Sequence, residues 1–317
     1  MDGISKGLWF NLGELEYKAK MPECVLSNIY ELDRLVQGFT LDCVTIWTGV
    51  TNAGKTTMLT LIANETIKQG HRVFYFNGEQ TPDVFLNNLM RQNAESKDIY
   101  ELRKENTPLV SRFVREEKAT KLKNFYDNKL FLFNNEAPRD IDSLLFAMEE
   151  CRRTKGVRVF ILDNFMQIDL VKDDVYQEQS RIMEKLRTFA VTKKVHIHLV
   201  AHPRKTAEFQ TRLSLYDISG SMNLANKAYN VISIMRTDSI DEESAEHKKL
   251  ETQLINEGFD LSEAGAVLEV LKTKGEGCGL VPLRYDKTLK TYQSISPLDN
   301  LTKERRKQEI MSKSRRQ

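Results

Sequence analysis

Short apolar runs alternate with longer stretches of helical periodicity along most of the chain. Beyond residue 43 the apolar runs predict strands at 44–48, 72–76, 130–133, 157–162, 195–201, 231–235 and 266–271. The stretches at 57–68, 82–94, 111–127, 139–155 and 175–193 have the pattern of helices. Several of the strands are apolar almost throughout, as central parallel strands are. This alternation predicts an α/β fold with a mostly parallel central sheet and helices on both faces.

The two ends of the chain and one internal stretch depart from the alternation. Residues 1–35 are expected to form an N-terminal linker or arm, residues 36–296 the main domain, and residues 297–317 a basic, flexible tail. The stretch 238–263 is acidic and polar, which predicts a surface insertion between two strands. Residues 303–317 hold seven Lys or Arg and two Glu, whereas the whole chain has a net charge of +2. The body is therefore slightly acidic, so any DNA-binding site in it must be a local basic feature.

The sequence argues against a membrane-spanning protein and against a secreted one. No apolar run approaches the length of a membrane span, and the first residues lack the pattern of a signal peptide. The cysteines, Cys24, Cys43, Cys151 and Cys278, are scattered and form no C-x-x-C pair. They are expected to be reduced thiols, which predicts a cytoplasmic protein without membrane contact.

Residues 49–56 read GVTNAGKT and match the phosphate-binding loop pattern G-x-x-x-x-G-K-S/T without a gap. The loop lies between a predicted strand and a predicted helix, where backbone N–H groups and the helix N-terminus cradle phosphate oxygens. Lys55 would reach the β- and γ-phosphates, and the Thr56 hydroxyl would bind Mg²⁺. The sequence therefore predicts a site for ATP or another nucleoside triphosphate, formed by Gly49, Asn52, Ala53, Gly54, Lys55, Thr56 and Thr57.

Two carboxylates follow predicted strands at the edge where this site is expected. Asp163 ends the apolar run 159–162 and is the candidate second ligand for Mg²⁺; the alternative is an ordinary aspartate in a turn. Glu79 follows the strand 72–76 and is the candidate base that orients and deprotonates the attacking water. Its alternative role is to cap the helix that begins near Pro82.

His202 ends the strand 195–201, where it would touch the γ-phosphate and report hydrolysis to the loop that follows. His196 and His198 share one face of this strand and are expected to be packed or solvated, because no fitting Cys or carboxylate for a zinc site is near. The basic loop beyond would grip the backbone of single-stranded DNA by charge. The alternative is a loop with ordinary surface cations. Its candidate DNA-binding residues are Arg204, Lys205, Arg212, Gly220 and Ser221.

Five of these motifs stand in the order and spacing of a known family across residues 28–290. They are the phosphate-binding loop, Asn77-Gly78-Glu79, Leu162-Asp163-Asn164-Phe165, Ala201-His202-Pro203-Arg204-Lys205, and Gly220-Ser221 followed by residues 226–232. In these motifs the chain resembles the RecA-type motor domain of the DnaB-like replicative helicases, including mitochondrial Twinkle and the phage primase-helicases. The resemblance implies a RecA-like P-loop NTPase fold.

The resemblance also implies a homo-hexameric ring that moves 5′ to 3′ on single-stranded or forked DNA, with ATP bound between subunits. Arg236 and Tyr285 match the residues that flank the base, and Lys272 and Lys274 match a basic pair that reaches the neighbour's site, where Lys274 would act in catalysis. The family commonly has Lys and Arg in that pair, and a Lys supplies charge without the planar fork. A compact motor of this kind suggests a phage or mobile element, with a separate primase and other replisome proteins as partners.

Two alternatives remain open from the sequence. One is a recombination or clock-type ATPase that shares the RecA-like fold but forms filaments or acts on protein, without unwinding DNA. The other is a loader or accessory protein that holds ATP as a structural ligand. Glu79 argues against the second, because an inert site needs no carboxylate beside the γ-phosphate.

Overall fold

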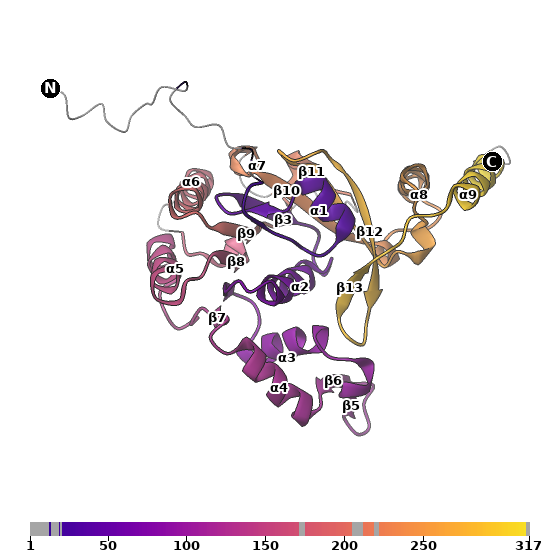
Figure 1. The fold of residues 1–317 in the computed structure, drawn as a ribbon. Coiled ribbons are helices and arrows are strands. Elements are labelled where there is room, and N and C mark those ends of the chain that lie inside the picture. Colours follow the sequence, from indigo (N-terminus) through magenta and orange to yellow (C-terminus); the bar gives the residue numbers. More distant parts are fainter. Residues whose placement is uncertain are drawn as a thin grey trace.

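A nine-stranded sheet runs through the described part of the molecule (Figure 1). The computed structural model describes residues 13, 19, 21–170, 175–204, 212–218 and 222–314. The order of strands across the sheet is β13 (Thr291–Ser294), β12 (Gly279–Asp286), β11 (Ala266–Lys272), β10 (Asn230–Arg236), β3 (Val44–Thr48), β9 (His196–Val200), β8 (Val159–Asp163), β4 (Val73–Asn77) and β7 (Leu130–Leu132).

The strands from β10 to β7 are parallel, and β11, β12 and β13 add an antiparallel edge. The register places Asn77 at the end of β4 directly opposite Asp163 at the end of β8. The carboxyl ends of β3, β4, β8 and β9 therefore meet at one edge of the sheet, which is where ligands gather in folds of this kind. The predicted mostly parallel sheet is confirmed.

Helices cover both faces of the sheet. The helices of the described residues are α1 (Tyr30–Val36), α2 (Lys55–Lys68), α3 (Pro82–Gln92), α4 (Glu116–Tyr126), α5 (Ile141–Lys155), α6 (Val175–Lys193), α7 (Met222–Lys227), α8 (Ala245–Glu257) and α9 (Asn300–Ser314), of which α9 lies against α8. Adjacent residues of β8 enter opposite cores, because side chains alternate along a strand. Ile161 packs in the core beneath α2 and α3, and Phe160 in the core beneath α5 and α6.

The predicted helix over 111–127 is wrong in its first part. Residues 99–114 form a hairpin of β5 (Ile99–Arg103) and β6 (Val110–Val114), and α4 begins only at Glu116. Tyr100 lies opposite Phe113 across the hairpin, with ring centroids 6.0 Å apart. This cross-strand pairing joins residues distant in the chain, and so it overrides the weak helical pattern of the segment.

The acidic stretch 238–263 is more than a surface insertion. It contains α8, which Ser244 caps by accepting a hydrogen bond from the backbone N–H of His247. Leu250 and Leu254, one helical turn apart, are buried in a third hydrophobic cluster together with Met235 of β10. Charged residues cover only the outer face of this helix, so the overall acidity of the stretch concealed its apolar face.

Described residues on both sides of the expected main domain also contact it. Residues 24–36 join it, because β1 (Cys24–Val25) pairs with β2 (Phe39–Thr40) and the backbone N–H of Glu276 donates to the carbonyl of Leu35 at 2.9 Å. The expected flexible tail contains α9, which lies against α8 and pairs Arg306 with Asp260 at 2.6 Å. Part of the basic tail is therefore helical and pairs with an acidic neighbour.

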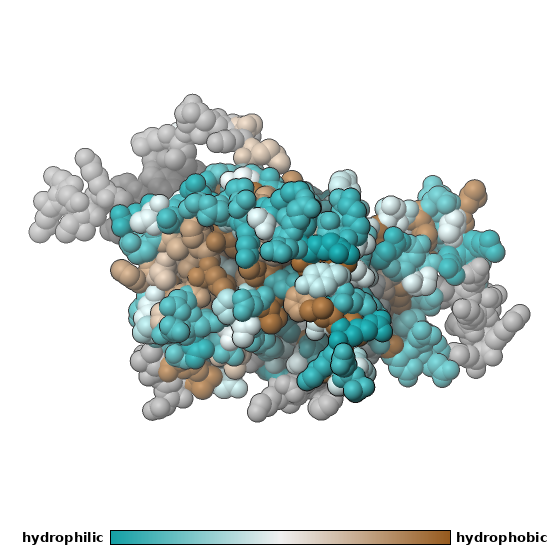
Figure 2. All heavy atoms as spheres, turned by 90° about the horizontal axis from the view of Figure 1, so that it is seen from below, coloured by the Kyte–Doolittle hydropathy of each residue, from teal (hydrophilic) through white to brown (hydrophobic). Residues whose placement is uncertain are grey.

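The face seen from below is mostly hydrophilic, with separate hydrophobic areas between polar ones (Figure 2). Within the described residues, no helix is both long and apolar enough to cross a membrane.

Candidate nucleotide-binding site

The phosphate-binding loop turns tightly between β3 and α2. Gly49 has φ 151° and Gly54 has φ 99°, a region that side chains rarely adopt. A Cβ atom on Gly49 would lie 2.4 Å from the carbonyl oxygen of Ile234, and one on Gly54 would lie 2.0 Å from the Tyr292 hydroxyl. Both positions therefore require glycine.

Lys55 begins α2 with its side chain folded back over the loop. Its Nζ donates to the carbonyl oxygens of Gly49 at 2.8 Å and Val50 at 2.9 Å. Burial lowers the pKa of Lys55, while the charges of Asp163 and Glu79 raise it. The ammonium is thus placed among negative groups at the amino end of α2, where a phosphate would bind.

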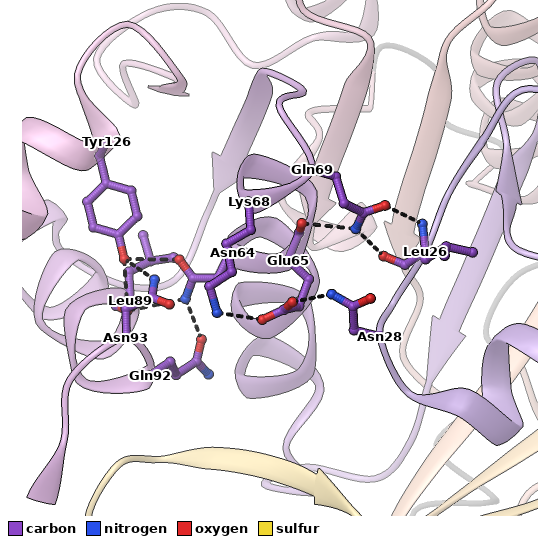
Figure 3. A network of polar contacts seen from close by, with 10 residues as sticks. All are labelled: Leu26, Asn28, Asn64, Glu65, Lys68, Gln69, Leu89, Gln92, Asn93 and Tyr126. Carbon is purple, nitrogen blue, oxygen red and sulfur yellow. Dashed lines mark hydrogen bonds and ion pairs between the residues drawn. The ribbon is translucent and has the colours of Figure 1, made fainter.

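Contacts on both sides fasten α2 and so fix the position of the loop (Figure 3). On one side, Asn64 donates to Gln92 of α3 at 3.0 Å and accepts a hydrogen bond from the Tyr126 hydroxyl of α4 at 3.0 Å. On the other side, the Gln69 amide forms two hydrogen bonds with the backbone of Leu26, at 2.8 and 3.0 Å. These contacts hold the helix independently of the loop itself.

Asp163 ends β8 with only 4% of its surface exposed. Its Oδ2 accepts a hydrogen bond from the Tyr75 hydroxyl at 3.2 Å, and the Thr56 hydroxyl is near enough to lower the pKa of the carboxyl. Burial raises the pKa of Asp163 to about 6, the Glu79 charge adds to this, and the two hydroxyls oppose it. A hydroxyl and a carboxylate in contact beside the loop are the oxygen ligands that suit Mg²⁺.

Asn164 connects the remaining two polar groups of the site. Its Nδ2 donates to Glu79 Oε1 and lies 2.8 Å from His202 Nε2, while Glu79 Oε1 and His202 Nε2 are 3.7 Å apart. The backbone N–H groups of Glu79 and Gln80 donate to Asn77 Oδ1, which sets the turn after β4. The Glu79 side chain is bound by Asn164 rather than used as a helix cap.

These groups face one cavity of about 630 Å³. Its walls bring together predicted residues from four strand ends: Asn52, Gly54, Lys55, Thr56, Thr57, Glu79, Asp163 and His202. Gly49 and Ala53, also predicted, are not among the lining residues: the Gly49 carbonyl accepts a hydrogen bond from Lys55, and Ala53 is buried in the core. The cavity has the carboxylates, hydroxyl and ammonium that hydrolysis of a bound phosphoanhydride requires.

Two tyrosine rings, with an arginine beside them, line another part of the cavity. The Arg236 guanidinium lies 5.3 Å from the centre of the Tyr285 ring, which is 5.1 Å from the Tyr292 ring. Arg236 and Tyr285, the residues expected beside the base, both line the cavity. Lys290 and Tyr292 line it too, and sequence reasoning missed them because they belong to no motif. Asn164 stood inside a recognised motif but had no expected role.

A protein-family model described as an AAA domain matches residues 14–208. The chain belongs to this family. A solved structure described as an ATPase domain has a TM-score of 0.69 at 16% identity, over 88% of this chain and 94% of that one. A structure of a DnaB-like replicative helicase and its interactions with primase has a TM-score of 0.69 at 17% identity, over 87% of this chain and 63% of that longer one. These likenesses confirm the RecA-like fold and, in fold, the resemblance to DnaB-like motor domains.

The basic loop of this AAA domain is only partly described. Lys205, Gly220 and Ser221 lie outside the described residues. The backbone N–H of Arg204 donates to the carbonyl oxygen of Asp217 at 2.6 Å, which joins the two ends of the loop.

Arg212 has a different environment from the one expected of a DNA contact. Its guanidinium forms two hydrogen bonds with Glu269 of β11, at 2.8 and 2.7 Å, and a third with Gln253 of α8 at 2.6 Å. A bidentate pair with a carboxylate leaves little of the guanidinium for a phosphate. Arg212 anchors the loop end to the antiparallel side of the sheet, an arrangement that spacing along the chain could not reveal.

Lys272 and Lys274 lie far from their own phosphate-binding loop. Lys272 pairs in register with Val231 at the start of β10, the strand end opposite the nucleotide edge. Its Nζ donates to the carbonyls of Ala225, Asn226 and Ala228, each at 2.8 Å, and so caps the end of α7. The Lys274 side chain is exposed, with Nζ 5.5 Å from the centre of the Tyr229 ring.

His196 and His198 are packed strand histidines. His196 contacts the Thr40 carbonyl at 2.8 Å and the Thr45 hydroxyl at 3.1 Å, and His198 Nδ1 accepts from Trp47 at 3.1 Å. Throughout the described ranges, no group of three or more His, Cys, Asp or Glu could hold a metal ion.

Proposed function

We propose that this chain is the ATP-driven motor of a DNA helicase, acting as a hexameric ring that moves 5′ to 3′ on single-stranded DNA. The observation that carries the proposal is the single cavity shared by Lys55, Thr56, Asp163 and Glu79, with Asn164 between Glu79 and His202. A site that only binds nucleotide would not need a base in that position. The fold shared with two structures described as helicase or ATPase domains supports the motor assignment.

In this proposal each residue of the cavity has its own role in ATP hydrolysis. Glu79 would accept a proton from a water molecule and aim it in line at the γ-phosphate. Lys55 would stabilise the charge that develops on the phosphate oxygens. Mg²⁺ held by Thr56 and Asp163 would neutralise phosphate charge. Lys274 of an adjacent subunit would complete the site.

The Asn164 amide offers a route from hydrolysis to movement. It contacts both Glu79 and His202, and His202 lies two residues before Arg204, where the basic loop begins. A change in the Glu79 contacts on loss of the γ-phosphate would therefore reach the loop directly. With Lys205, Gly220 and Ser221, this loop would pull single-stranded DNA through the ring. A separate primase is the expected partner, since one matching structure is described with its primase interactions.

Strand separation on forked DNA tests the proposal. The substrates carry either a 5′ or a 3′ single-stranded loading tail, and Lys55→Ala serves as the blank. We expect ATP-dependent unwinding only with the 5′ tail. Hydrolysis stimulated by DNA without unwinding would favour a recombination-type ATPase. Absence of hydrolysis would refute the proposal that the chain is an enzyme.

A further inference from the structure

The turn between β12 and β13 is fastened to α3 across the edge of the cavity. Arg91 donates to the carbonyl oxygen of Thr288 through Nε at 3.0 Å and Nη2 at 2.6 Å. The Gln92 amide donates both to the carbonyl of Lys290 and to that of Thr57 in the first turn of α2, each at 2.9 Å. Figure 3 shows the same Gln92 beside Asn64 of α2. The turn is thereby held close to the start of α2.

This position brings the Lys290 side chain into the wall of the cavity. Its Nζ donates to Asn88 Oδ1 at 3.0 Å, and among the described residues no carboxylate pairs with it. Burial lowers the pKa of Lys290, and the nearby Arg91 charge lowers it further. A half-buried cation beside a second cation needs an anion, because desolvated charge is costly without a partner.

We propose that Lys290 is a second cation for the phosphate chain of the nucleotide, supplied by the β12–β13 turn of the same subunit. This rests on the nucleotide site of the proposed function. An ammonium has three donors and Asn88 takes one, so two remain for phosphate oxygens. Asn88 also donates to Gln80 at 3.2 Å, the residue after Glu79. Phosphate bound by Lys290 would therefore help to hold the turn that carries Glu79.

Binding of ADP with Mg²⁺, measured by titration calorimetry at two salt concentrations, tests this role without the complication of hydrolysis. Lys290→Met keeps the apolar stem and removes the charge, Lys290→Arg keeps the charge, and Lys287→Met is the control on the exposed side of the same turn. We expect about tenfold weaker binding and a smaller salt dependence for Lys290→Met. Lys290→Arg should recover most of the affinity, and Lys287→Met should bind as the unaltered chain does.

Thermal unfolding separates binding from folding. Without nucleotide, Lys290→Met should melt at or above the temperature of the unaltered chain, because it removes a charge that lacks a counter-ion. When ADP is added, the melting temperature of Lys290→Met should rise by less than that of the unaltered chain. Equal ADP affinity in Lys290→Met and the unaltered chain would overturn the inference, as would an equal loss in Lys287→Met. Failure of the unaltered chain to bind ADP would instead refute the proposed nucleotide site.

Discussion

At the scale of single residues, Asn164 connects Glu79 and His202 at the edge of the sheet that carries the candidate site. Its side chain is buried, whereas about half of the Glu79 side chain is exposed. An exposed carboxylate samples several rotamers unless a fixed partner holds it. The buried amide provides that partner and contacts His202 as well, so one residue positions the proposed base and connects it with His202, two residues before the basic loop.

Replacement of Glu79 tests the assignment of the base. Glu79→Gln keeps the size of the side chain and an acceptor for Asn164, but its amide cannot take a proton from water. We expect unchanged ATP affinity and about 100-fold or greater loss of phosphate release, with no unwinding. Steady-state hydrolysis and nucleotide titration measure the two effects. Glu105→Gln, exposed in the β5–β6 turn, is the control, and retained unwinding in Glu79→Gln would remove Glu79 from this role.

At the scale of elements, β9 is unusual in carrying two histidines with no exposed surface at the centre of a parallel sheet. Burial lowers the pKa of His196 to about 4 and that of His198 well below its ordinary range. Both rings are therefore neutral in the folded protein, where they take part in hydrogen bonds with Thr45 and Trp47 of the neighbouring β3. These contacts join β9 to the strand that precedes the phosphate-binding loop.

This burial predicts a pH-dependent stability. Between pH 6.5 and 4 the unfolded chain binds a proton at His196 and the folded chain does not. The stability contributed by the neutral ring is therefore complete above pH 6.5 and is lost as the pH falls toward 4, by about 3 kcal/mol. Denaturant unfolding at several pH values measures the slope. His196→Gln should reduce the slope but leave the contribution of His198, whereas the same change at the partly exposed His71 should not reduce it.

At the scale of the whole molecule, a catalytic role for Lys274 would require a neighbouring subunit. β11 runs antiparallel to β10, so its end lies at the edge of the sheet opposite the phosphate-binding loop. Lys274 follows that end and is exposed, so it has no path to the cavity of its own chain. If Lys274 acts in hydrolysis, the catalytic site lies between two subunits of a ring.

Mixing of inactive variants tests this arrangement. Lys274→Ala and Lys55→Ala should each lower hydrolysis by on the order of 100-fold or more when alone. In mixed rings, an intact loop from the first variant meets an intact Lys274 from the second, so hydrolysis should partly return. Glu79→Gln mixed with Lys55→Ala should recover nothing, since both residues serve one chain's cavity. No recovery in the first mixture would contradict a role between subunits.

The sequence by itself determined the parts of this protein that depend on local pattern. The strand–loop–helix around Lys55 follows from glycines at required conformations and from apolar runs on either side. One further rule, that parallel strands end at the same edge of a sheet, predicted that Asp163, Glu79 and His202 lie near the phosphate-binding loop. Their shared cavity could therefore be predicted without knowledge of the tertiary contacts.

Only the tertiary structure decided which polar side chains meet across distant segments. The bond from Arg212 to Glu269, the position of Lys290 beside Asn88 and the β5–β6 pairing each join residues that no local pattern relates. The apolar face of α8 was likewise not recognised in the sequence, because charged residues surround it in the chain and only the folded structure shows which side is buried. Local pattern specifies most of the elements, though not the β5–β6 hairpin. The partner of a buried charge or a strand edge is set by packing between elements that the chain brings together only on folding.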